Sequence, residues 1–389
     1  MKLDCLDYLN INSHLNENEI MAQKATKEFV NKEILPIIDI HFEQAKFPNM
    51  LISKMADMGF LGINLPKKYG GNNLNNIFYG LICQEIERGD SSIRSFISVQ
   101  NSLVIYPIFK YGSQNQKDKW LPLLANGTSI GCFGLTEPDY GSDPGNMQTL
   151  AEKVSGGYIL NGTKMWITNG TISDISIIWA RTNKNIIRGF LIEKDMKGFS
   201  TTEIKHKWSL RSSITSELIM QDVFIPDENL LPNIEGLKGP LSCLNQARYG
   251  IGWGAVGSAM AVYESSVKYA KDRIQFSKPI ASFQLIQDKL VWMLTEITKG
   301  QLLSYHLGKC KDKGTATPQQ ISMVKRNNTW MARECAKIAR EIHGANGISG
   351  EYPIMRHLMN LESVYTYEGT FDMHTLIVGE DITGISAFK

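Results

Sequence analysis

The sequence predicts an α+β fold of several domains, in which a helical part, a β-rich part and a second helical part follow one another. The chain has 389 residues, 43% of them hydrophobic, which exceeds one typical domain and is enough for a large core. Apolar residues recur at helical spacing before and after a central stretch of short β-rich runs. We therefore expect domains at residues 1–130, 131–238 and 239–389.

The first part is predicted to be helical. Residues 19–58 have helical spacing, with Pro36 as a local break and with apolar anchors at Met21, Ala25, Phe29, Ile34, Ile37 and Ile38. Further helices are expected between residues 75 and 111. Within them, Gly89 is predicted to end one helix, and Asp90 or Ser91 to cap the next.

The central part is predicted to be β-rich. From residue 131 to about 233, apolar and β-branched runs at 158–160, 175–179, 189–192 and 218–220 alternate with Gly, Asn, Asp and Pro turns. This pattern is typical of a compact antiparallel β domain. After residue 239 the helical period returns in three long segments, at about 239–271, 284–311 and 318–343.

Residues 252–257 match the dinucleotide-binding pattern G-x-G-x-x-G, which needs a preceding strand and a following helix. The preceding residues 243–249 do not have the composition of a strand. Gly250, Gly254 and Gly257 fall on one helical face, which favours close helix packing over nucleotide binding. A Rossmann dehydrogenase is therefore disfavoured.

Composition narrows the functional classes. The net charge is +2, from 41 basic and 39 acidic residues, so nothing indicates a nucleic-acid or acidic-membrane surface. No run of about 18 apolar residues predicts a membrane span. The first residues resemble neither a signal peptide nor a transit sequence, so we expect a cytoplasmic protein, or a mitochondrial matrix protein if a leader was removed. The six cysteines form no C-x-x-C pair, so we expect reduced packing residues and no metal site.

Glu368 is the first candidate for chemistry. It is the only carboxylate in residues 365–371, and it lies between the aromatic residues Tyr365 and Tyr367 on one side and Gly369 on the other. Partial desolvation by aromatic rings would strengthen a carboxylate as a proton acceptor, and glycine lets a ligand approach closely. The alternative is a solvated or structurally paired glutamate.

Arg94 is the second candidate. Arg94 and Ser98 are four residues apart and would share a helix face. An arginine beside hydroxyls can clamp a carboxylate, because a guanidinium offers forked donors to two oxygens. The alternative is that Arg94 pairs with Glu87 or with solvent.

Residues 131–142 and 162–170 form a third candidate region. Both segments look like strand ends that open into turns. There, backbone N–H groups and the hydroxyls of Thr136, Ser142 and Thr168 could meet a polar ring system, with Trp166 as a stacking face.

These segments, together with residues 272–280, 283–284, 343–348 and 365–374, resemble in their order the acyl-CoA dehydrogenase family of FAD flavoproteins. The resemblance covers nearly the whole chain. Residues 93–100, 131–138, 244–251 and 381–385 are most similar to its glutaryl-CoA dehydrogenase branch. The resemblance implies an N-terminal α-helical domain, a middle β-barrel-like domain and a C-terminal four-helix bundle. It also implies a homotetramer built as a dimer of dimers, with an electron-transfer flavoprotein as acceptor.

The resemblance assigns roles residue by residue. The base is Glu368. The substrate would be bound by Glu87, Arg94, Ser95, Ser98, Ser142, Leu244, Asn245, Arg248, Tyr367 and Gly369. FAD would be bound by Phe133, Leu135, Thr136, Gly141, Ser142, Trp166, Ile167, Thr168, Thr370 and Asp372, and from a neighbouring subunit by Arg273, Phe276, Gln284, His343, Gly344 and Ala345. Two positions depart from the family pattern: Phe371 replaces a usual His, and Ala345 a usual Gly.

The implied reaction begins with removal of the pro-R α-proton of an acyl-CoA thioester by Glu368, while the β-hydride passes to flavin N5. The Glu368 N–H and a ribityl hydroxyl of FAD would bind the thioester oxygen. With glutaryl-CoA, loss of carbon dioxide and reprotonation give crotonyl-CoA, and Glu87 and Tyr367 match the decarboxylating members. The alternatives are a non-decarboxylating or other short-chain acyl-CoA dehydrogenase, an acyl-CoA oxidase, and a non-catalytic helical scaffold.

Overall fold

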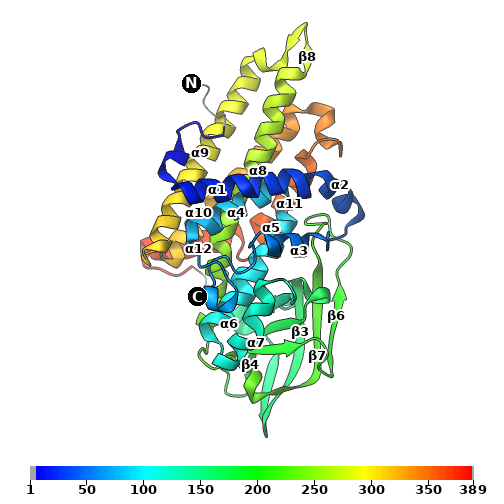
Figure 1. The fold of residues 1–389 in the computed structure, drawn as a ribbon. Helices are drawn as coiled ribbons and strands as arrows, with labels where there is room; N and C mark the ends of the chain where they lie inside the picture. The colour runs from blue at the N-terminus through cyan, green and yellow to red at the C-terminus, as the bar shows by residue number, and fades with distance from the viewer. Residues whose placement is uncertain (1–5, 388–389) are drawn as a thin grey trace.

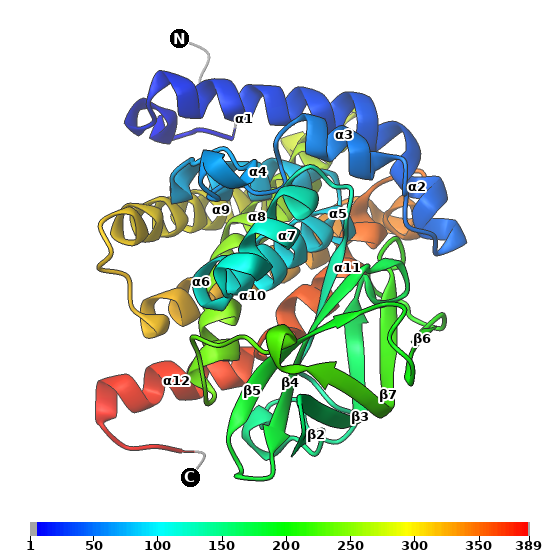
Figure 2. The same cartoon turned by 60° about the horizontal axis from the view of Figure 1, so that its bottom comes forward.

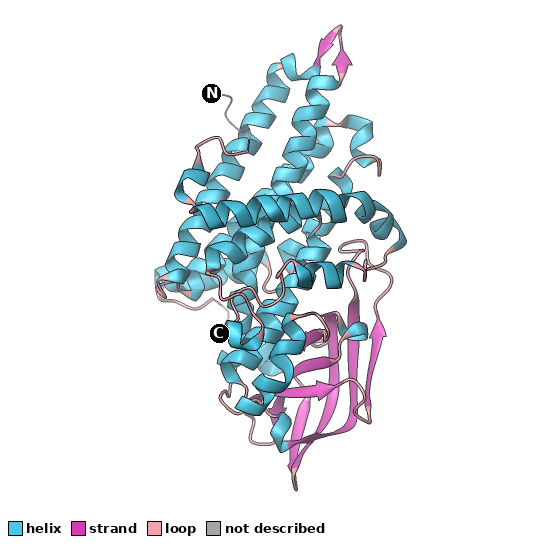
Figure 3. Cartoon of the chain, viewed as in Figure 1, coloured by secondary structure: helices cyan, strands magenta, loops and turns pink. Residues whose placement is uncertain are grey.

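The computed structural model describes residues 6–387 and has a helical part, a sheet and a second helical part in that order along the chain. Figure 1 shows the helices gathered in one elongated body, with the sheet at its lower end. Figure 3 shows the strands confined to that end, apart from a small two-stranded hairpin at the opposite tip. The predicted α+β order of parts is confirmed.

The first part contains seven α-helices: α1 (Glu17–Phe29), α2 (Leu35–Gln44), α3 (Leu51–Asp57), α4 (Asn76–Gly89), α5 (Ser91–Ser98), α6 (Tyr106–Tyr111) and α7 (Gln114–Ala125). Pro36 lies in the first turn of α2, where its missing N–H is not needed. The irregularity expected at Pro36 comes just before it, as a π-helical turn at Val30–Ile34. A second π-helical segment, Val99–Ile105, joins α5 to α6.

The middle part is a seven-stranded sheet of β1 (Gly131–Gly134), β2 (Leu150–Val154), β3 (Gly157–Thr168), β4 (Ile175–Thr182), β5 (Ile187–Glu193), β6 (Phe199–Glu203) and β7 (Thr215–Pro226). The expectation of a purely antiparallel sheet is wrong. β4 pairs in parallel with both β1 and β2, although the other pairs are antiparallel. Alternation of apolar and turn residues predicts strands but not their direction, so the sequence could not show this.

The second helical part contains α8 (Lys238–Asp272), α9 (Gln284–Asp312), α10 (Pro318–Ile342), α11 (Ile354–Thr366) and α12 (Phe371–Thr383). The three long helices begin and end within one residue of the expected segments. β8 (Ile274–Gln275) and β9 (Lys278–Pro279) form the hairpin between α8 and α9. Figure 2 shows α9 along the left side of the helical body and α12 at its lower edge.

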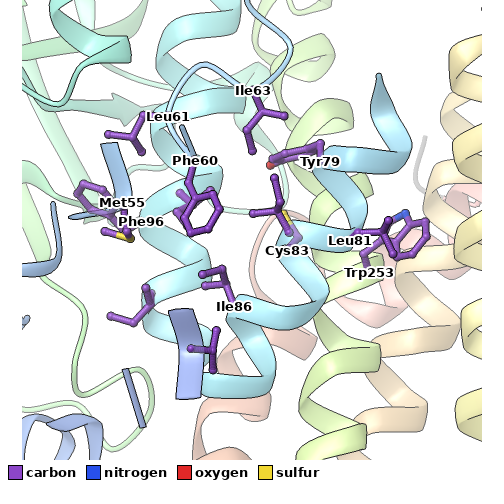
Figure 4. Packing of buried hydrophobic residues seen from close by; sticks show 14 of the residues in the cluster. Met55, Phe60, Leu61, Ile63, Tyr79, Leu81, Cys83, Ile86, Phe96 and Trp253 are labelled. Atoms are coloured by element: carbon purple, nitrogen blue, oxygen red, sulfur yellow. The ribbon is translucent and has the colours of Figure 1, made fainter. Parts of the chain in front are cut away.

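The glycine face of α8 packs closely, as expected. A Cβ atom added to Gly250 would touch the Tyr79 hydroxyl at 2.8 Å, and one on Gly254 or Gly257 would collide with Glu87 or Gln84 of α4. The G-x-G-x-x-G motif is therefore internal to a buried helix. Figure 4 shows part of the adjoining core, where Trp253 of α8 lies beside α4.

Five cysteines lie within the described residues, and all five are free thiols. Four are buried, at positions 83, 132, 243 and 335, whereas Cys310 is half-buried. Cys5 lies outside the described part of the chain. Within residues 6–387, no helix is long and apolar enough to span a bilayer.

Candidate active site

Glu368 lies in the short loop between α11 and α12, residues 367–370. Its φ is 53°, and that of Gly369 is 98°, so both residues occupy the left-handed region that is costly for a residue other than glycine. A side chain at Gly369 would also come within 2.9 Å of His374 Nε2. Thr370 then caps α12, because its Oγ1 accepts a hydrogen bond from the Met373 N–H at 3.1 Å. Backbone strain of this kind is typical of functional sites.

The Glu368 carboxylate is buried, and one of its two oxygens makes no hydrogen bond to the described residues. Oε2 is buried and has no hydrogen-bond partner among the described residues. Burial raises the pKa of Glu368 to about 7, against the opposing charges of Arg94, Arg248 and Lys325. Arg248 Nε donates to the Glu368 carbonyl oxygen at 2.7 Å. Glu368 is therefore a carboxylate that can take up a proton near neutral pH.

Glu87, Arg94 and Tyr367 form a buried group that we call the Arg94 cluster. Arg94 Nε donates to Glu87 Oε2 at 2.5 Å, and Arg94 Nη2 donates to the Tyr367 hydroxyl. Burial works against the charge of Arg94, but Glu87 and Tyr367 outweigh it, so the pKa of Arg94 stands above its usual range. The cluster therefore keeps a cation in the interior.

The Arg94 cluster has unused donors. Arg94 Nη1 and Ser98 Oγ are buried, and neither has a partner within residues 6–387. The pairing of Arg94 with Glu87, which the sequence left as an alternative to a ligand role, is present. It uses Nε of the guanidinium, and Tyr367 binds Nη2, so Nη1 is the donor left for a ligand, and the clamp of a carboxylate by Arg94 stays a prediction. A ligand oxygen would meet Nη1 and the hydroxyl.

The helix that carries Arg94 is fixed at its first turn. Asp90 is the N-cap of α5 and accepts from the Ser92 N–H at 2.7 Å, as one of the two expected caps. Its other carboxylate oxygen binds Arg356 Nη1 and Asn360 Nδ2 of α11, each at 2.8 Å. Because α11 ends at Thr366, directly before the loop that bears Glu368, this loop and the helix bearing Arg94 are joined at two places, through Asp90 and through the Arg94–Tyr367 bond.

The remaining predicted substrate residues lie around this centre. Ser95 is buried on α5. On α8, Leu244 and Asn245 are half-buried, and Asn245 Oδ1 accepts from Arg248 Nη1 at 3.2 Å. Asn245 also lines a cavity of about 200 Å³, which adjoins a second of about 330 Å³ at Tyr106 and Gln246. Glu368 lines neither of them, and Ser142 lies exposed in the loop after β1.

The residues predicted to face the flavin ring come from two strand ends that lie together. Met165 N–H donates to the Thr136 carbonyl at 2.9 Å, which joins the segment after β1 to the end of β3. Trp166 follows at a break in the β3–β7 register, with a φ of 64° and 58% of its surface exposed. Phe133, Leu135 and Ile167 are buried, Thr136 and Thr168 are half-buried, and Gly141 is exposed. An exposed indole beside backbone polar groups suits a flat polar ring.

The residues predicted to reach FAD from a neighbouring subunit lie elsewhere in this chain. Arg273, Phe276 and Gln284 are exposed at the β8–β9 hairpin, at the opposite end of the molecule from the sheet (Figure 1). Gly344 and Ala345 are exposed too. Asp372, which was not predicted to act from a neighbouring subunit, is exposed in the first turn of α12. His343 is buried, stacked on Tyr269 with ring centroids 4.4 Å apart. Its two ring nitrogens lie 2.8 Å from the Ala339 carbonyl and 3.2 Å from Ser265 Oγ.

Two aromatic residues differ in their surroundings. Tyr367 takes part in the Arg94 cluster. The ring of Tyr365 instead stacks on that of Phe371, with centroids 5.1 Å apart, and Arg333 Cζ lies over it, 4.9 Å from the ring centroid. Phe371, at the position where the family pattern has His, starts α12 and lies under Arg326. Both tyrosines were expected to pack against Glu368. Only Tyr367 lies in the buried group beside it, because Tyr365 packs against Phe371 and Arg333 instead.

Two residues at this site were missed in the sequence. Lys325 of α10 donates to the Tyr367 and Gly369 carbonyls at 3.0 and 2.7 Å. His374 is buried on α12, and burial lowers its pKa to about 2. A signal for Lys325 was present, because it shares a helix face with the apolar Ile321 and Ala332, where a lysine is unexpected.

Three family models together match most of the chain. "Acyl-CoA dehydrogenase, N-terminal domain" matches residues 16–128, the middle domain of the same family matches 132–223, and the C-terminal domain matches 235–383. An acyl-CoA dehydrogenase of Bacillus subtilis (strain 168) is 36% identical over 376 residues, which are 95% of this chain and 99% of the relative.

Solved structures agree with the family models. A glutaryl-CoA dehydrogenase of Mycobacterium smegmatis is 48% identical, with a TM-score of 0.97 over 99% of each chain. A structure from the same organism, described as a glutaryl-CoA dehydrogenase in complex with FADH2, is 46% identical, with a TM-score of 0.97 over 99% of each chain. Likeness at this level covers the fold from the first helices to α12.

Proposed function

The chain belongs to the acyl-CoA dehydrogenase family, and from that premise we propose that it oxidises and decarboxylates glutaryl-CoA to crotonyl-CoA and carbon dioxide. It is an FAD-dependent oxidoreductase of the acyl-CoA dehydrogenase class. The solved relatives described as glutaryl-CoA dehydrogenases support the choice of substrate.

The Arg94 cluster is the observation that carries this proposal. A buried arginine that stays charged, with Nη1 and Ser98 Oγ unpartnered, suits an acyl chain that ends in a carboxylate. An unsubstituted chain would leave both donors unsatisfied, at a cost of about 1–3 kcal/mol each. The carboxylate of glutaryl-CoA would supply the missing acceptor.

Glu368 takes the role of the base. Its raised pKa, about 7, makes it a proton acceptor of suitable strength for the α-carbon of a thioester. No described residue accepts a hydrogen bond from the Glu368 backbone N–H, so this donor is available to the thioester oxygen, where negative charge develops. Arg248 binds the Glu368 carbonyl, which belongs to the following peptide unit, and so restrains the loop directly after this N–H.

The strand ends around Trp166 and Thr136 fit the isoalloxazine ring of FAD, and Thr370 and Asp372 would lie toward its ribose and phosphate part. FAD, when bound, supplies the acceptor for the hydride that leaves the β-carbon. The exposed hairpin residues would complete the FAD site of a partner chain, which makes a homotetramer part of the proposal. An electron-transfer flavoprotein is proposed as the acceptor that reoxidises the enzyme.

The residues of the chain account for the proton steps. Glu368 takes one proton from the α-carbon. Once the β-hydride has also left, the resulting unsaturated thioester carries a carboxylate that can leave as carbon dioxide. The electron pair left on carbon then takes back the proton held by Glu368, which gives crotonyl-CoA and restores the base. Arg94 has to hold a carboxylate that later departs, and Nη1 is the donor that it has free for this role.

Isotopic labelling tests the proposed function. The purified flavoprotein is incubated with glutaryl-CoA labelled in the distal carboxyl group and with an artificial electron acceptor. We expect labelled carbon dioxide and crotonyl-CoA in equal amounts. Accumulation of glutaconyl-CoA without carbon dioxide would mean a non-decarboxylating enzyme, and no turnover of glutaryl-CoA would refute the substrate assignment.

A further inference from the structure

Lys325 is a buried lysine to which the proposed reaction gives no role. We propose that Lys325 is a positioning residue, which fixes the Glu368 carboxylate by binding backbone carbonyls on both sides of it. This inference rests on the proposed role of Glu368 as the base.

The contacts of Lys325 are all with the Glu368 loop and the helix before it. The side chain is fully buried on α10. Nζ donates to the carbonyls of Gly369 at 2.7 Å, Tyr367 at 3.0 Å and Tyr365 at 3.4 Å. Among the described residues, no carboxylate oxygen lies within 4.0 Å of this ammonium group. Nothing in these contacts stabilises α10 itself, so the lysine acts on the loop.

The loop needs such an anchor. Glu368 and Gly369 both have positive φ values, 53° and 98°, and a residue other than glycine holds that conformation only where its surroundings enforce it. The last carbonyls of α11 have no partner within the helix, and a cation is favoured at a helix C-terminus. Lys325 meets both needs at once.

Arg248 and Lys325 bind different backbone carbonyls of the Glu368 loop. Arg248 binds the carbonyl of Glu368, and Lys325 binds the carbonyls of the residues immediately before and after it. Three successive carbonyls are thereby held by α8 and α10. The carboxylate of Glu368 is not needed for any of these contacts, so it stays free for the substrate.

Lys325 also affects the charge of Glu368. Burial lowers the pKa of Lys325 to about 7, and the Glu368 carboxylate opposes that fall, whereas Arg248 and Arg94 add to it. The charge of Lys325 also contributes to lowering the pKa of His374 on α12. A cation beside a carboxylate lowers the pKa of the acid. Removing the charge of Lys325 should therefore raise the pKa of Glu368.

The test uses Lys325→Met, which keeps an unbranched side chain only one atom shorter but removes the charge and the donors. The matched control is Lys207→Met, because Lys207 also donates to two backbone carbonyls, those of Leu210 and Ser213, in a loop that carries no predicted site residue. Thermal unfolding and FAD content measure the structural effect of both changes.

Two readouts separate positioning from stability. The infrared band of the protonated Glu368 carboxyl, identified by its loss in Glu368→Gln, gives the pKa of Glu368 in the resting protein. In Lys325→Met we expect the pKa of Glu368 to rise by about one pH unit. We also expect kcat for glutaryl-CoA to fall on the order of tenfold to a hundredfold at a KM within about threefold, because a misplaced base slows the chemical step. In Lys207→Met neither should change.

The outcomes are distinguishable. An unchanged Glu368 band and an unchanged kcat in Lys325→Met would overturn the inference, as would equal effects in the two variants. Should Lys325→Met fail to fold, Lys325→Gln, which keeps one N–H donor without charge, is held to the same two results. A wild-type protein that turns over no acyl-CoA thioester would refute the proposed function, whereas the infrared shift would still report whether Lys325 acts on Glu368.

Discussion

The Arg94 cluster is formed within one chain, whereas some of the residues predicted to face FAD, such as Trp166 and Phe276, lie exposed at two ends of the molecule. Arg94 and Glu87 are fully buried and bonded to each other. Trp166 and Phe276 expose 58% and 89% of their surfaces. The acyl end of the site can be formed by folding alone, because Glu87 and Tyr367 bind the buried guanidinium and leave Nη1 for a ligand. The flavin end needs a ligand and, in our proposal, a second subunit to cover it.

The largest expected effect separates the base from the rest of the site. Glu368→Gln keeps the shape of the side chain but cannot take up the α-proton. We expect kcat to fall on the order of a hundredfold to ten-thousandfold, with FAD content nearly unchanged. The measurement is flavin bleaching by glutaryl-CoA in a stopped-flow instrument. Bleaching at the wild-type rate would remove Glu368 from the mechanism.

The second prediction concerns the wall behind the Arg94 cluster. A methyl group at Gly254 would collide with the Glu87 carboxylate, so Gly254→Ala should lower the free energy of unfolding by about 1–3 kcal/mol. The control is Gly379→Ala on α12, where nothing lies within 4 Å of the added atom and where alanine should stabilise the helix by about 0.5–1 kcal/mol. Urea titration of both variants checks the sign. A stable Gly254→Ala protein would contradict the packing described here.

The third prediction is a pH dependence. Because the pKa of Glu368 is raised to about 7, the base is protonated below that pH and available above it. We expect kcat/KM, which reports the pKa of the free enzyme, to fall by about tenfold for each pH unit below 7 and to level off above it. The profile in deuterated substrate tests whether the chemical step is being observed. A flat profile between pH 5 and 8 would show that burial of Glu368 does not control the rate.

The smallest effect on stability is expected at the exposed end. Phe276→Asn removes a ring that this chain leaves in solvent, and asparagine tolerates the positive φ of 51° at this position. The free energy of unfolding should change by less than about 0.5 kcal/mol, while retention of FAD on dilution weakens on the order of tenfold. Leu9→Asn, an exposed apolar residue far along the chain from the hairpin, is the control. Equal retention of FAD in both would remove Phe276 from the cofactor site.

The same contrast explains what the sequence could predict. The long helices α8, α9 and α10 were predicted to within one residue, because their apolar period is uninterrupted. The glycine face of α8 was predicted for the same reason. The direction of β4 relative to β1 was not, because alternation along a strand contains no information on its neighbours.

At the site, the candidate residues could be predicted from the sequence, but the contacts that each of them makes could not. Arg94 and Tyr367 are 273 positions apart, so their bond, which takes one arm of the guanidinium, has no local signature. The positive φ of Glu368 is likewise set by contacts from α8 and α10. Lys325 was missed because a lysine in a helix is ordinarily solvated, and only its apolar neighbours on the same face mark it as buried.

The central claim is that the Arg94 cluster selects an acyl chain ending in a carboxylate. The most direct test is kcat/KM of the wild-type and Arg94→Ala proteins, each with glutaryl-CoA and with butyryl-CoA. Leaving a desolvated carboxylate without its partner costs on the order of 2 to 5 kcal/mol, so glutaryl-CoA should lose roughly thirtyfold to several-thousandfold. Butyryl-CoA, which has no distal carboxylate, should lose far less. Equal proportional losses for the two substrates would mean that Arg94 supports only the fold, and the substrate assignment would be wrong.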